Sequence, residues 1–280
     1  MTLREYYGFP EGLDVDMTYI PHWLADKPNF PIPSQTQYLF SRLYNPIPLV
    51  NTSNVRNMSS LFDNAFITTM EGTENWDTSN CTNMNNMFYY CRNLTDISAM
   101  ANWNTSNVTN MDALFSYAQT LKNIDAIGGW DVSNVTSMKN LCSNTNVNSA
   151  EFIRNWDTSN CTNMHQIFYN TGAITSIPYI NCINVDKDSY PVYSYSDNNN
   201  LTDLGGFYMK NSWVNTYGLV KCPKLTVESL VNVLNALYDF TGNSETPNSN
   251  QGKLALGATN LAKLTDEQKA IATNKGWTLS

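Results

Sequence analysis

The sequence has few charged residues, and acidic residues outnumber basic ones. Asp, Glu, Lys and Arg make up 14% of the 280 residues, and the formal net charge is −8. About 25% of the residues of a typical soluble protein are charged. The closest approach to a basic run is Lys221 and Lys224 around Pro223. Since a surface that binds nucleic acid needs clustered Lys and Arg to release counterions, we expect no nucleic-acid partner.

Long apolar runs and a recognisable export signal are also missing. A helix that spans a bilayer needs about 20 consecutive apolar residues, and no run approaches this length. The first residues, MTLREYYGFPEGLDVDM, contain no basic segment followed by an apolar one and no cleavage site of small residues. We therefore expect no membrane insertion and no cleaved signal peptide.

Residues for metal or nucleophilic chemistry are scarce. His22 and His165 are the two histidines, and no C-x-x-C, G-x-S-x-G or phosphate-binding glycine loop occurs. A zinc site, a serine hydrolase or a nucleotide site would need such patterns. A carboxylate pair for glycoside hydrolysis stays open, because the sequence does not show which of its 24 acidic residues converge. We expect no enzyme activity, no metal and no cofactor, and a glycan-active enzyme is the least favoured alternative.

What the sequence does contain is an internal repeat of about 26 residues, in which a methionine recurs at spacings of 26, 27, 27 and 26. A unit of this length cannot bury its own apolar side, so neighbouring units must stack around a shared core. Four of the five units are preceded by a tryptophan: Trp76, Trp103, Trp130 and Trp156. The units are SNVRNMSSLF from Ser53, SNCTNMNNMF from Ser79, SNVTNMDALF from Ser106, SNVTSMKNLC from Ser133 and SNCTNMHQIF from Ser159.

Each unit can be divided into predicted elements. The N-M-x-x-M-F stretch has apolar residues at i, i+3 and i+4, which predicts one helical turn. A later L-x-x-I stretch, such as Leu94 to Ile97, predicts a short strand that turns into the next tryptophan. The residue after the repeated methionine varies, as in Asp112 and His165, and is expected to be exposed.

One asparagine recurs in every unit and predicts a ladder along the stack. Its side-chain amide can satisfy backbone groups of the tight turn inside the stack, whereas an Asn-rich loop would not keep this register. The aspartates that recur before it, as at Asp77, are expected to serve the same turn. The predicted ladder consists of Asn54, Asn80, Asn107, Asn134 and Asn160.

The pattern W-D-T-S-N-V-T-N-M-x-x-M-F-x-x-C-x-x-L-x-x-I resembles the BspA-like leucine-rich repeat, also described as the mycoplasma-type surface lipoprotein repeat. The resemblance covers about residues 50–186. It implies an α/β repeat solenoid, a leucine-rich-repeat-like stack of about 26-residue units, with a binding or structural role. Many members of this family are bacterial surface proteins or adhesins, but this sequence shows neither a signal peptide nor a lipid-anchor cysteine.

The six cysteines follow the repeat. Cys81 and Cys161 take the place of valines in other units, Cys142 takes the place of a phenylalanine, and Cys91 takes the place of an alanine. Buried free cysteine behaves as a small hydrophobe, so we expect reduced core thiols. A disulfide between Cys182 and Cys222 stays open, because both lie beyond the regular units.

Two other regions flank the repeats. Residues 1–49 are rich in aromatics and proline and are interpreted as a cap or an attachment arm, whereas residues 187–224 are a degenerate connector. Residues 225–280 predict a small α/β module: a helix capped by Thr226 and ended by Gly242, a strand KLALG, and a second helix with a Thr265–Gln268 capping box. This module resembles one that follows leucine-rich repeats in tail, baseplate or fibre proteins of phages infecting gut bacteria.

These features favour a non-enzymatic structural and binding module, a bacteriophage fibre, tail or capsid decoration that resides in the virion and mediates assembly or host attachment. The alternative is an adhesin on the bacterial cell surface. Expected partners are other virion proteins or further copies of the chain in a homo-oligomer, and a host surface protein or glycan. Since few charges are present, aromatic side chains are the candidate contacts. For assembly they are Tyr6, Tyr7, Phe9, Tyr19 and Trp23, and for the ligand they are Tyr190, Tyr193, Tyr195, Phe207 and Tyr208.

Overall fold

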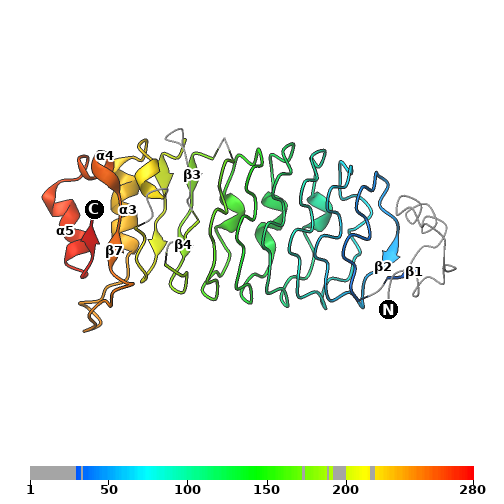
Figure 1. Cartoon of the computed structure of the whole chain (residues 1–280), viewed down its shortest axis with the longest axis horizontal. Helices are drawn as coiled ribbons and strands as arrows, with labels where there is room; N and C mark the ends of the chain where they lie inside the picture. The colour runs from blue at the N-terminus through cyan, green and yellow to red at the C-terminus, as the bar shows by residue number, and fades with distance from the viewer. Residues whose placement is uncertain (1–29, 33, 172–173, 188, 192–199, 215–217) are drawn as a thin grey trace.

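The described residues form one elongated stack of coils (Figure 1). The computed structural model describes residues 30–32, 34–171, 174–187, 189–191, 200–214 and 218–280. Strands β1 (Phe30–Pro31) and β2 (Val50–Asn51) lie at one end of the stack, and the helices of the carboxyl-terminal module lie at the other.

Successive units lie side by side and in parallel. One backbone position of each unit bridges to the same position of the next, in a series that runs Gln35, Asn57, Asn83, Asn110, Ser137 and Asn163. Strands continue the pattern, since β3 (Ser176–Ile177) pairs with β5 (Asp203–Leu204), and β4 (Ile180–Asn181) pairs with β6 (Phe207–Tyr208). Each unit of the sequence is therefore one coil of the stack.

The first coil starts before residue 50, where the sequence predicted a separate arm. Leu39 and Phe40 are buried, and the Phe40 ring lies 5.3 Å from that of Phe62. Thr36 stands where the other units have methionine, and its hydroxyl donates to the carbonyl of Asn57. Without the methionine, this coil could not be recognised from the repeat pattern.

The helical turn expected at N-M-x-x-M-F is not formed. In the third unit the amide of Leu114 donates to the carbonyl of Met111, but Ala113 has a φ of 52°, in the left-handed region. Its amide then points to the next coil and donates to the carbonyl of Lys139. The stretch is thus a series of turns that bonds to its neighbour, because a right-handed helix would use these amides internally.

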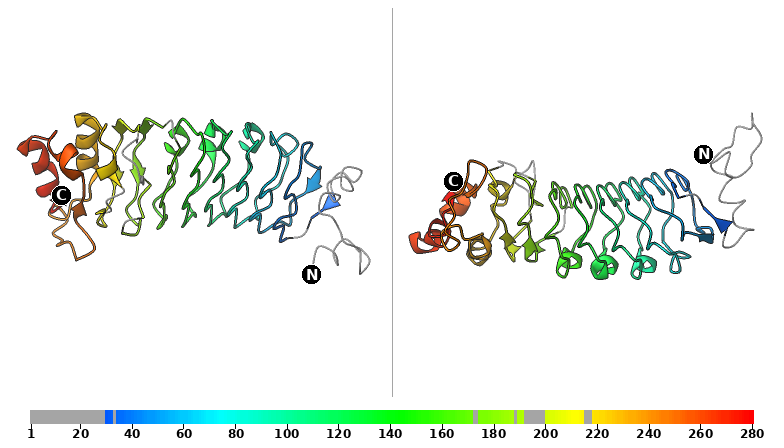
Figure 2. Two further views of the ribbon diagram at one scale, coloured as in Figure 1. Left: turned by 45° about the horizontal axis from the view of Figure 1, so that its top comes forward. Right: turned by 90° about the horizontal axis from the view of Figure 1, so that it is seen from below.

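Three 3-10 helices lie in a row along one edge of the stack (Figure 2). They are η1 (Ser98–Met100), η2 (Asp125–Gly129) and η3 (Glu151–Ile153). The L-x-x-I stretch of each unit was expected to be a strand. In the fifth unit a strand forms there, β3. In the second unit the strand is reduced to a single bridge between Thr69 and Asp96.

The core runs along the inside of the coils. The repeated methionines are fully buried, and the Phe88 ring stacks between those of Phe62 and Phe115 at 5.4 and 5.3 Å. Tryptophans form a second column, with Trp103 between Trp76 and Trp130 at 5.6 and 6.2 Å. Repetition of one apolar side chain per coil therefore produces continuous columns of rings and sulfur atoms.

Helix α3 (Val227–Ala236) covers the end of this core. Thr226 caps it as expected, accepting a hydrogen bond from the Ser229 amide, and Leu230, Val233 and Leu234 are buried. The helix ends at Ala236, before the expected Gly242, because Leu237 adopts an extended backbone.

A glycine lets helix α3 lie close to the last coils. A Cβ at Gly206 would come within 2.7 Å of the Asn232 carbonyl oxygen, so only glycine fits this approach. Gly206 also has a φ of 105°, a conformation that favours glycine.

The remaining elements are short. Helix α5 (Asp266–Thr273) has the expected capping box, with Thr265 and Gln268 exchanging hydrogen bonds. The expected strand is β7 (Lys253–Leu254), which pairs in parallel with β8 (Thr278–Leu279). Helix α4 (Gly257–Leu261) and the 3-10 helix η4 (Leu219–Lys221) were not expected. No helix among the described residues is both long enough and apolar enough to cross a membrane.

Candidate binding groove

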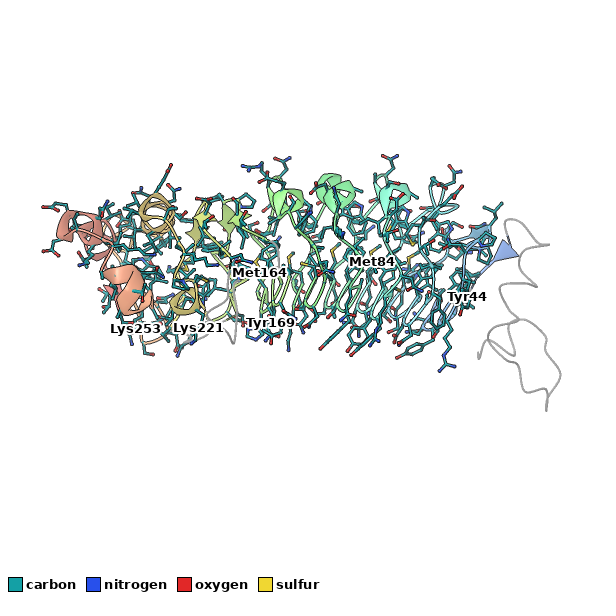
Figure 3. The ribbon with its side chains drawn as sticks, turned by 90° about the horizontal axis from the view of Figure 1, so that it is seen from above. Tyr44, Met84, Met164, Tyr169, Lys221 and Lys253 are labelled. Atoms are coloured by element: carbon teal, nitrogen blue, oxygen red, sulfur yellow. The ribbon has the colours of Figure 1, made fainter. Side chains whose placement is uncertain are left out.

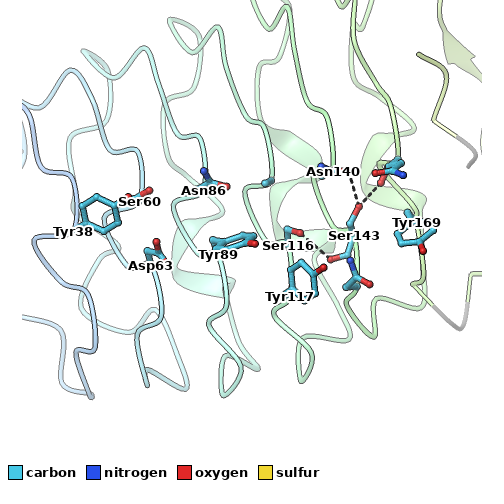
Figure 4. Close-up of a pocket in the computed structure, with 13 residues that line it drawn as sticks. Tyr38, Ser60, Asp63, Asn86, Tyr89, Ser116, Tyr117, Asn140, Ser143 and Tyr169 are labelled. Atoms are coloured by element: carbon cyan, nitrogen blue, oxygen red, sulfur yellow. Dashed lines mark hydrogen bonds between the residues drawn. The ribbon is translucent and has the colours of Figure 1, made fainter. Parts of the chain in front are cut away.

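A groove with a volume of about 550 Å³ crosses six successive coils (Figure 4). Tyr169, near one end of it, lies on the side of the stack away from the 3-10 helices (Figure 3). We call this feature the tyrosine groove. Its lining consists of Tyr38, Ser60, Asp63, Asn86, Tyr89, Ala113, Ser116, Tyr117, Asn140, Ser143, Asn144, Gln166 and Tyr169.

Left-handed backbone builds the floor of the tyrosine groove. In every coil of the groove the residue at one equivalent lining position has a φ between 52° and 62°, a region that residues other than Gly, Asn and Asp rarely adopt. Hydrogen bonds between coils stabilise this conformation. For example, the Asn86 backbone amide donates to the Asp112 carbonyl at 2.8 Å. The row consists of Tyr38, Ser60, Asn86, Ala113, Asn140 and Gln166.

Two lining tyrosines, Tyr89 and Tyr117, meet at the centre of the tyrosine groove, and both pack against Tyr90. The rings of Tyr90 and Tyr117 are parallel, with an angle of 2° and centroids 4.5 Å apart. Tyr89 stands nearly perpendicular to both rings, at 4.6 and 5.7 Å. Burial, together with the neighbouring tyrosines, raises the pKa of the Tyr89 phenol. The Arg92 guanidinium lies 4.8 Å from the Tyr90 ring centre. All three rings are half-buried, so part of each remains on the surface.

Amide and hydroxyl groups line the next two coils. The Ser143 hydroxyl donates to the Gln166 carbonyl at 2.6 Å, and it also lies 3.3 Å from the Asn140 amide oxygen. The amide oxygen of Asn144 accepts a hydrogen bond from the Asn170 side chain at 2.9 Å. The Ser116 hydroxyl donates to the Ser143 carbonyl at 3.3 Å. This part of the groove can exchange neutral hydrogen bonds with a ligand.

The tyrosine groove is almost without charge. Asp63 is the one carboxylate among its lining residues, and no Lys or Arg lines it. Burial raises the pKa of the Asp63 carboxyl, and the hydrogen bond from the Asn64 amide at 2.6 Å opposes this effect. A glycoside hydrolase requires two carboxylates around the bond that is cleaved, and the lining supplies one.

The aromatic contacts expected from the sequence fall elsewhere. Tyr6, Tyr7, Phe9, Tyr19 and Trp23, with Tyr193 and Tyr195, lie outside the described residues.

Two of the expected ligand contacts are wrong, because they are core residues. Tyr190 is 1% exposed and its hydroxyl donates to the Asn211 carbonyl at 2.7 Å. Phe207 is fully buried and meets Trp213 edge to face at 5.6 Å. Tyr208 is half-buried and lies 6.2 Å from Tyr238, outside the tyrosine groove.

The central tyrosines were not identified from the sequence, although the repeat register carries a signal for them. Tyr89 and Tyr90 directly follow the repeated Phe88, and Tyr117 occupies the position of Tyr90 in the next unit. Aromatic residues at the same position of two successive units lie side by side on adjacent coils.

The asparagine ladder is present, but at the surface of the stack and not inside it. The Asn107 amide donates to the Ser79 carbonyl of the preceding coil at 2.8 Å, and three other members make the same bond. All five members, Asn54, Asn80, Asn107, Asn134 and Asn160, are exposed.

The recurring aspartates serve the turn, as expected. Asp77, Asp131 and Asp157 each accept a hydrogen bond from the backbone amide two residues later, at 3.0 Å. Hydrogen bonds from the serine side chain and backbone lower the pKa of all three carboxyls.

All six cysteines lie in the described part of the chain, and all are buried and unpaired. In the same residues, no group of three or more His, Cys, Asp or Glu side chains is placed to hold a metal ion. The residues after the repeated methionine were expected to be exposed, and Lys139 is, but Asp112 and His165 are half-buried. Asp112 contacts the next coil. Its carboxylate accepts a hydrogen bond from the Lys139 amide of the next coil at 2.7 Å.

A family model described as "Mycoplasma protein of unknown function, DUF285" matches residues 35–146 and again residues 95–203. The chain belongs to the DUF285 family. This is the Mycoplasma-type repeat family related to BspA-like surface protein repeats, so the resemblance is confirmed at that level. The DUF285 region begins with the coil that contains Leu39 and Phe40, before the expected boundary at residue 50. No curated protein and no solved structure matches the chain.

Proposed function

We propose that this chain is a non-enzymatic binding and structural protein. Its coils would form a solenoid of the leucine-rich-repeat type, and the tyrosine groove would hold the ligand. The observation that carries the proposal is the continuity of the groove, whose lining repeats over six coils. A repeated, open surface suits an extended ligand, whereas a catalytic centre needs a few groups converging on one bond.

The chemistry of the groove supports binding through neutral contacts. Aromatic rings with a polar tip provide large contact areas and hydrogen bonds at once. Since the lining carries one carboxylate and no base, long-range attraction of a charged partner contributes little. Specificity would then come from the positions of Tyr89 and Tyr117 and of the amides beside them.

We propose a phage virion appendage as the setting, because residues 225–280 resemble the module of phage fibre and tail proteins. Further copies of the chain or other virion proteins would be its assembly partners. A bacterial surface adhesin is the alternative, supported by the relation of DUF285 to surface protein repeats. Antibodies raised against the full chain should label purified virions; labelling of the cell envelope alone would favour the adhesin.

Binding through the groove is tested with fluorescently labelled full chain and whole host bacteria. Tyr117→Ala should weaken cell binding by about 3- to 10-fold, because an aromatic contact contributes about 0.5–1.5 kcal/mol. Tyr179→Ala is the matched control, since Tyr179 is 49% exposed and does not line the groove. Equal binding by the wild type and a folded Tyr117→Ala variant would contradict the proposal.

A further inference from the structure

We infer that the tyrosine groove binds a neutral polysaccharide chain, an inference that rests on the proposed binding function. The groove combines three properties on adjacent coils: half-buried tyrosine rings, uncommitted amide donors, and an almost complete lack of charge. A sugar residue presents C–H groups on its faces and hydroxyl groups at its rim. The rings and the amides match these two kinds of surface.

The spacing of the coils fits a chain of pyranose rings. Equivalent side chains on neighbouring coils are about one strand spacing apart, since the rings of Phe62, Phe88 and Phe115 follow at 5.4 and 5.3 Å. This distance is close to the length of one hexose in an extended polysaccharide. Successive sugars along the groove would therefore meet equivalent positions on successive coils.

An extended peptide fits this spacing less well. Its side chains on one face recur every second residue, at about 6.6–6.8 Å. Peptide-binding grooves also offer a free sheet edge or apolar pockets for side chains. The lining here is polar apart from Ala113 and the tyrosine rings, so it offers no such pocket.

The tyrosine cluster would supply the stacking surface. Tyr89 and Tyr117 lie side by side in the groove (Figure 4), and each is perpendicular to the other within about 10°. Arg92 and Tyr117 both lie over the ring of Tyr90, at 4.8 and 4.5 Å from its centre. The stack fixes the ring of Tyr117 before any ligand arrives, and such preorganisation reduces the entropy that binding costs.

The coils beyond the tyrosine cluster would supply the hydrogen bonds. The side-chain nitrogens of Asn140 and Asn144 donate to no other described residue, although both amide oxygens accept hydrogen bonds. Ser116 and Ser143 are buried and direct their hydroxyl protons to backbone carbonyls, so they hold neighbouring coils together beneath the two amides. The side-chain nitrogens of Asn140 and Asn144 are thus the donors that would meet the hydroxyls of a bound sugar.

The test is native affinity electrophoresis of the full chain. The gels contain a soluble β-glucan, an α-glucan, a mannan or a galactan, with hyaluronan as an anionic comparison. We expect at least one neutral polysaccharide to slow migration, and 0.5 M NaCl to leave the effect unchanged. Tyr117→Ala should weaken the retardation by about 3- to 10-fold, and Asn140→Ala should weaken it by about 2- to 10-fold. Tyr179→Ala should not change it.

Absence of retardation in all four neutral polysaccharides, or retardation by hyaluronan alone, would overturn the inference. Equal retardation of the wild type and Tyr117→Ala would do so too. Cell binding separates this failure from that of the proposed function. If Tyr117→Ala loses binding to whole cells, and if protease treatment of the cells but not periodate oxidation abolishes wild-type binding, the groove binds a protein. The binding function then stands without the polysaccharide.

Discussion

The cysteines show how a repeat position determines the chemistry of a side chain. Four of the six thiols lie where another unit has a small or apolar residue, and some donate to a neighbouring coil, as Cys142 does to the Ile167 carbonyl at 2.9 Å. Burial raises the pKa of Cys81 to about 11 and that of Cys161 to about 12. These thiols stay protonated in the folded chain under conditions where free cysteine ionises.

The raised pKa values predict a loss of stability in alkali. An unfolded cysteine loses its proton near pH 8.5, whereas Cys161 keeps it up to about pH 12. The contribution of the Cys161 thiol to the free energy of unfolding is fully present below about pH 8.5. It falls as the pH rises toward 12, by at most about 1.4 kcal/mol per pH unit. Cys161→Val, which introduces the residue found at Val108 and Val135, should give a shallower slope in chemical denaturation between pH 8.5 and 10. Equal slopes would mean that the thiol ionises as readily when folded.

Two positions of the repeat differ sharply in their expected contribution to the free energy of unfolding. Met111 is fully buried, so Met111→Ala should cost about 2–5 kcal/mol of unfolding free energy by leaving a cavity. Lys139 is exposed, so Lys139→Ala should change it by no more than about 0.5 kcal/mol. Urea denaturation of both variants measures the difference. Similar costs would show that the register of the coils is wrong.

The tryptophan column makes a prediction at the scale of the element. The indole of Trp130 donates to the Met100 carbonyl of the preceding coil at 3.0 Å, but that of Trp76 finds no partner among the described residues. Trp130→Phe removes one of the two hydrogen bonds that the Met100 carbonyl accepts, since the Trp103 amide also donates to it at 3.1 Å. This loss should cost about 0.5–1.5 kcal/mol more than the loss of ring area alone. Trp76→Phe lacks this extra cost. Thermal unfolding should therefore rank Trp76→Phe as the milder change, and the reverse order would contradict the assigned hydrogen bonds.

Elements were predictable from the sequence where the signal is local. The capping box of Thr265 and Gln268 needs two side chains three residues apart, so the start of helix α5 was correctly predicted. The buried positions of the repeat were equally readable, because the period alone places Met58 and its equivalents inside. These signals need no knowledge of the neighbouring coil.

The turns and the tyrosine groove depend on contacts between coils, which the sequence does not show. Ala113 and Tyr117 adopt left-handed backbone although neither residue type prefers it. Bonds such as the one from the Ala113 amide to the Lys139 carbonyl outweigh the local preference. The helical spacing of N-M-x-x-M-F was therefore misleading, and the row of residues that forms the groove floor was missed.

At the scale of the whole molecule, the amino-terminal segment is predicted to serve assembly. If the segment is an attachment arm, deletion of residues 1–24 should leave the melting temperature nearly unchanged. The truncated chain should then fail to enter the virion or the oligomer, as measured by sedimentation. Unfolding of the truncated chain would make the segment a cap, and normal assembly would show that Tyr6, Tyr7 and Phe9 are not needed.

Because neighbouring coils form the same hydrogen bonds with each other, the length of the stack can change by whole coils. Thr109 donates to the Thr82 carbonyl below it, and Thr136 donates to the Thr109 carbonyl in the same way. A duplicated segment the length of one coil would find the same partners on both sides, and the two ends would stay as they are. Gene duplication can therefore lengthen the protein in whole steps, and each added coil would extend the tyrosine groove by one position. A longer or shorter protein of this kind would need no new fold, only a different number of coils.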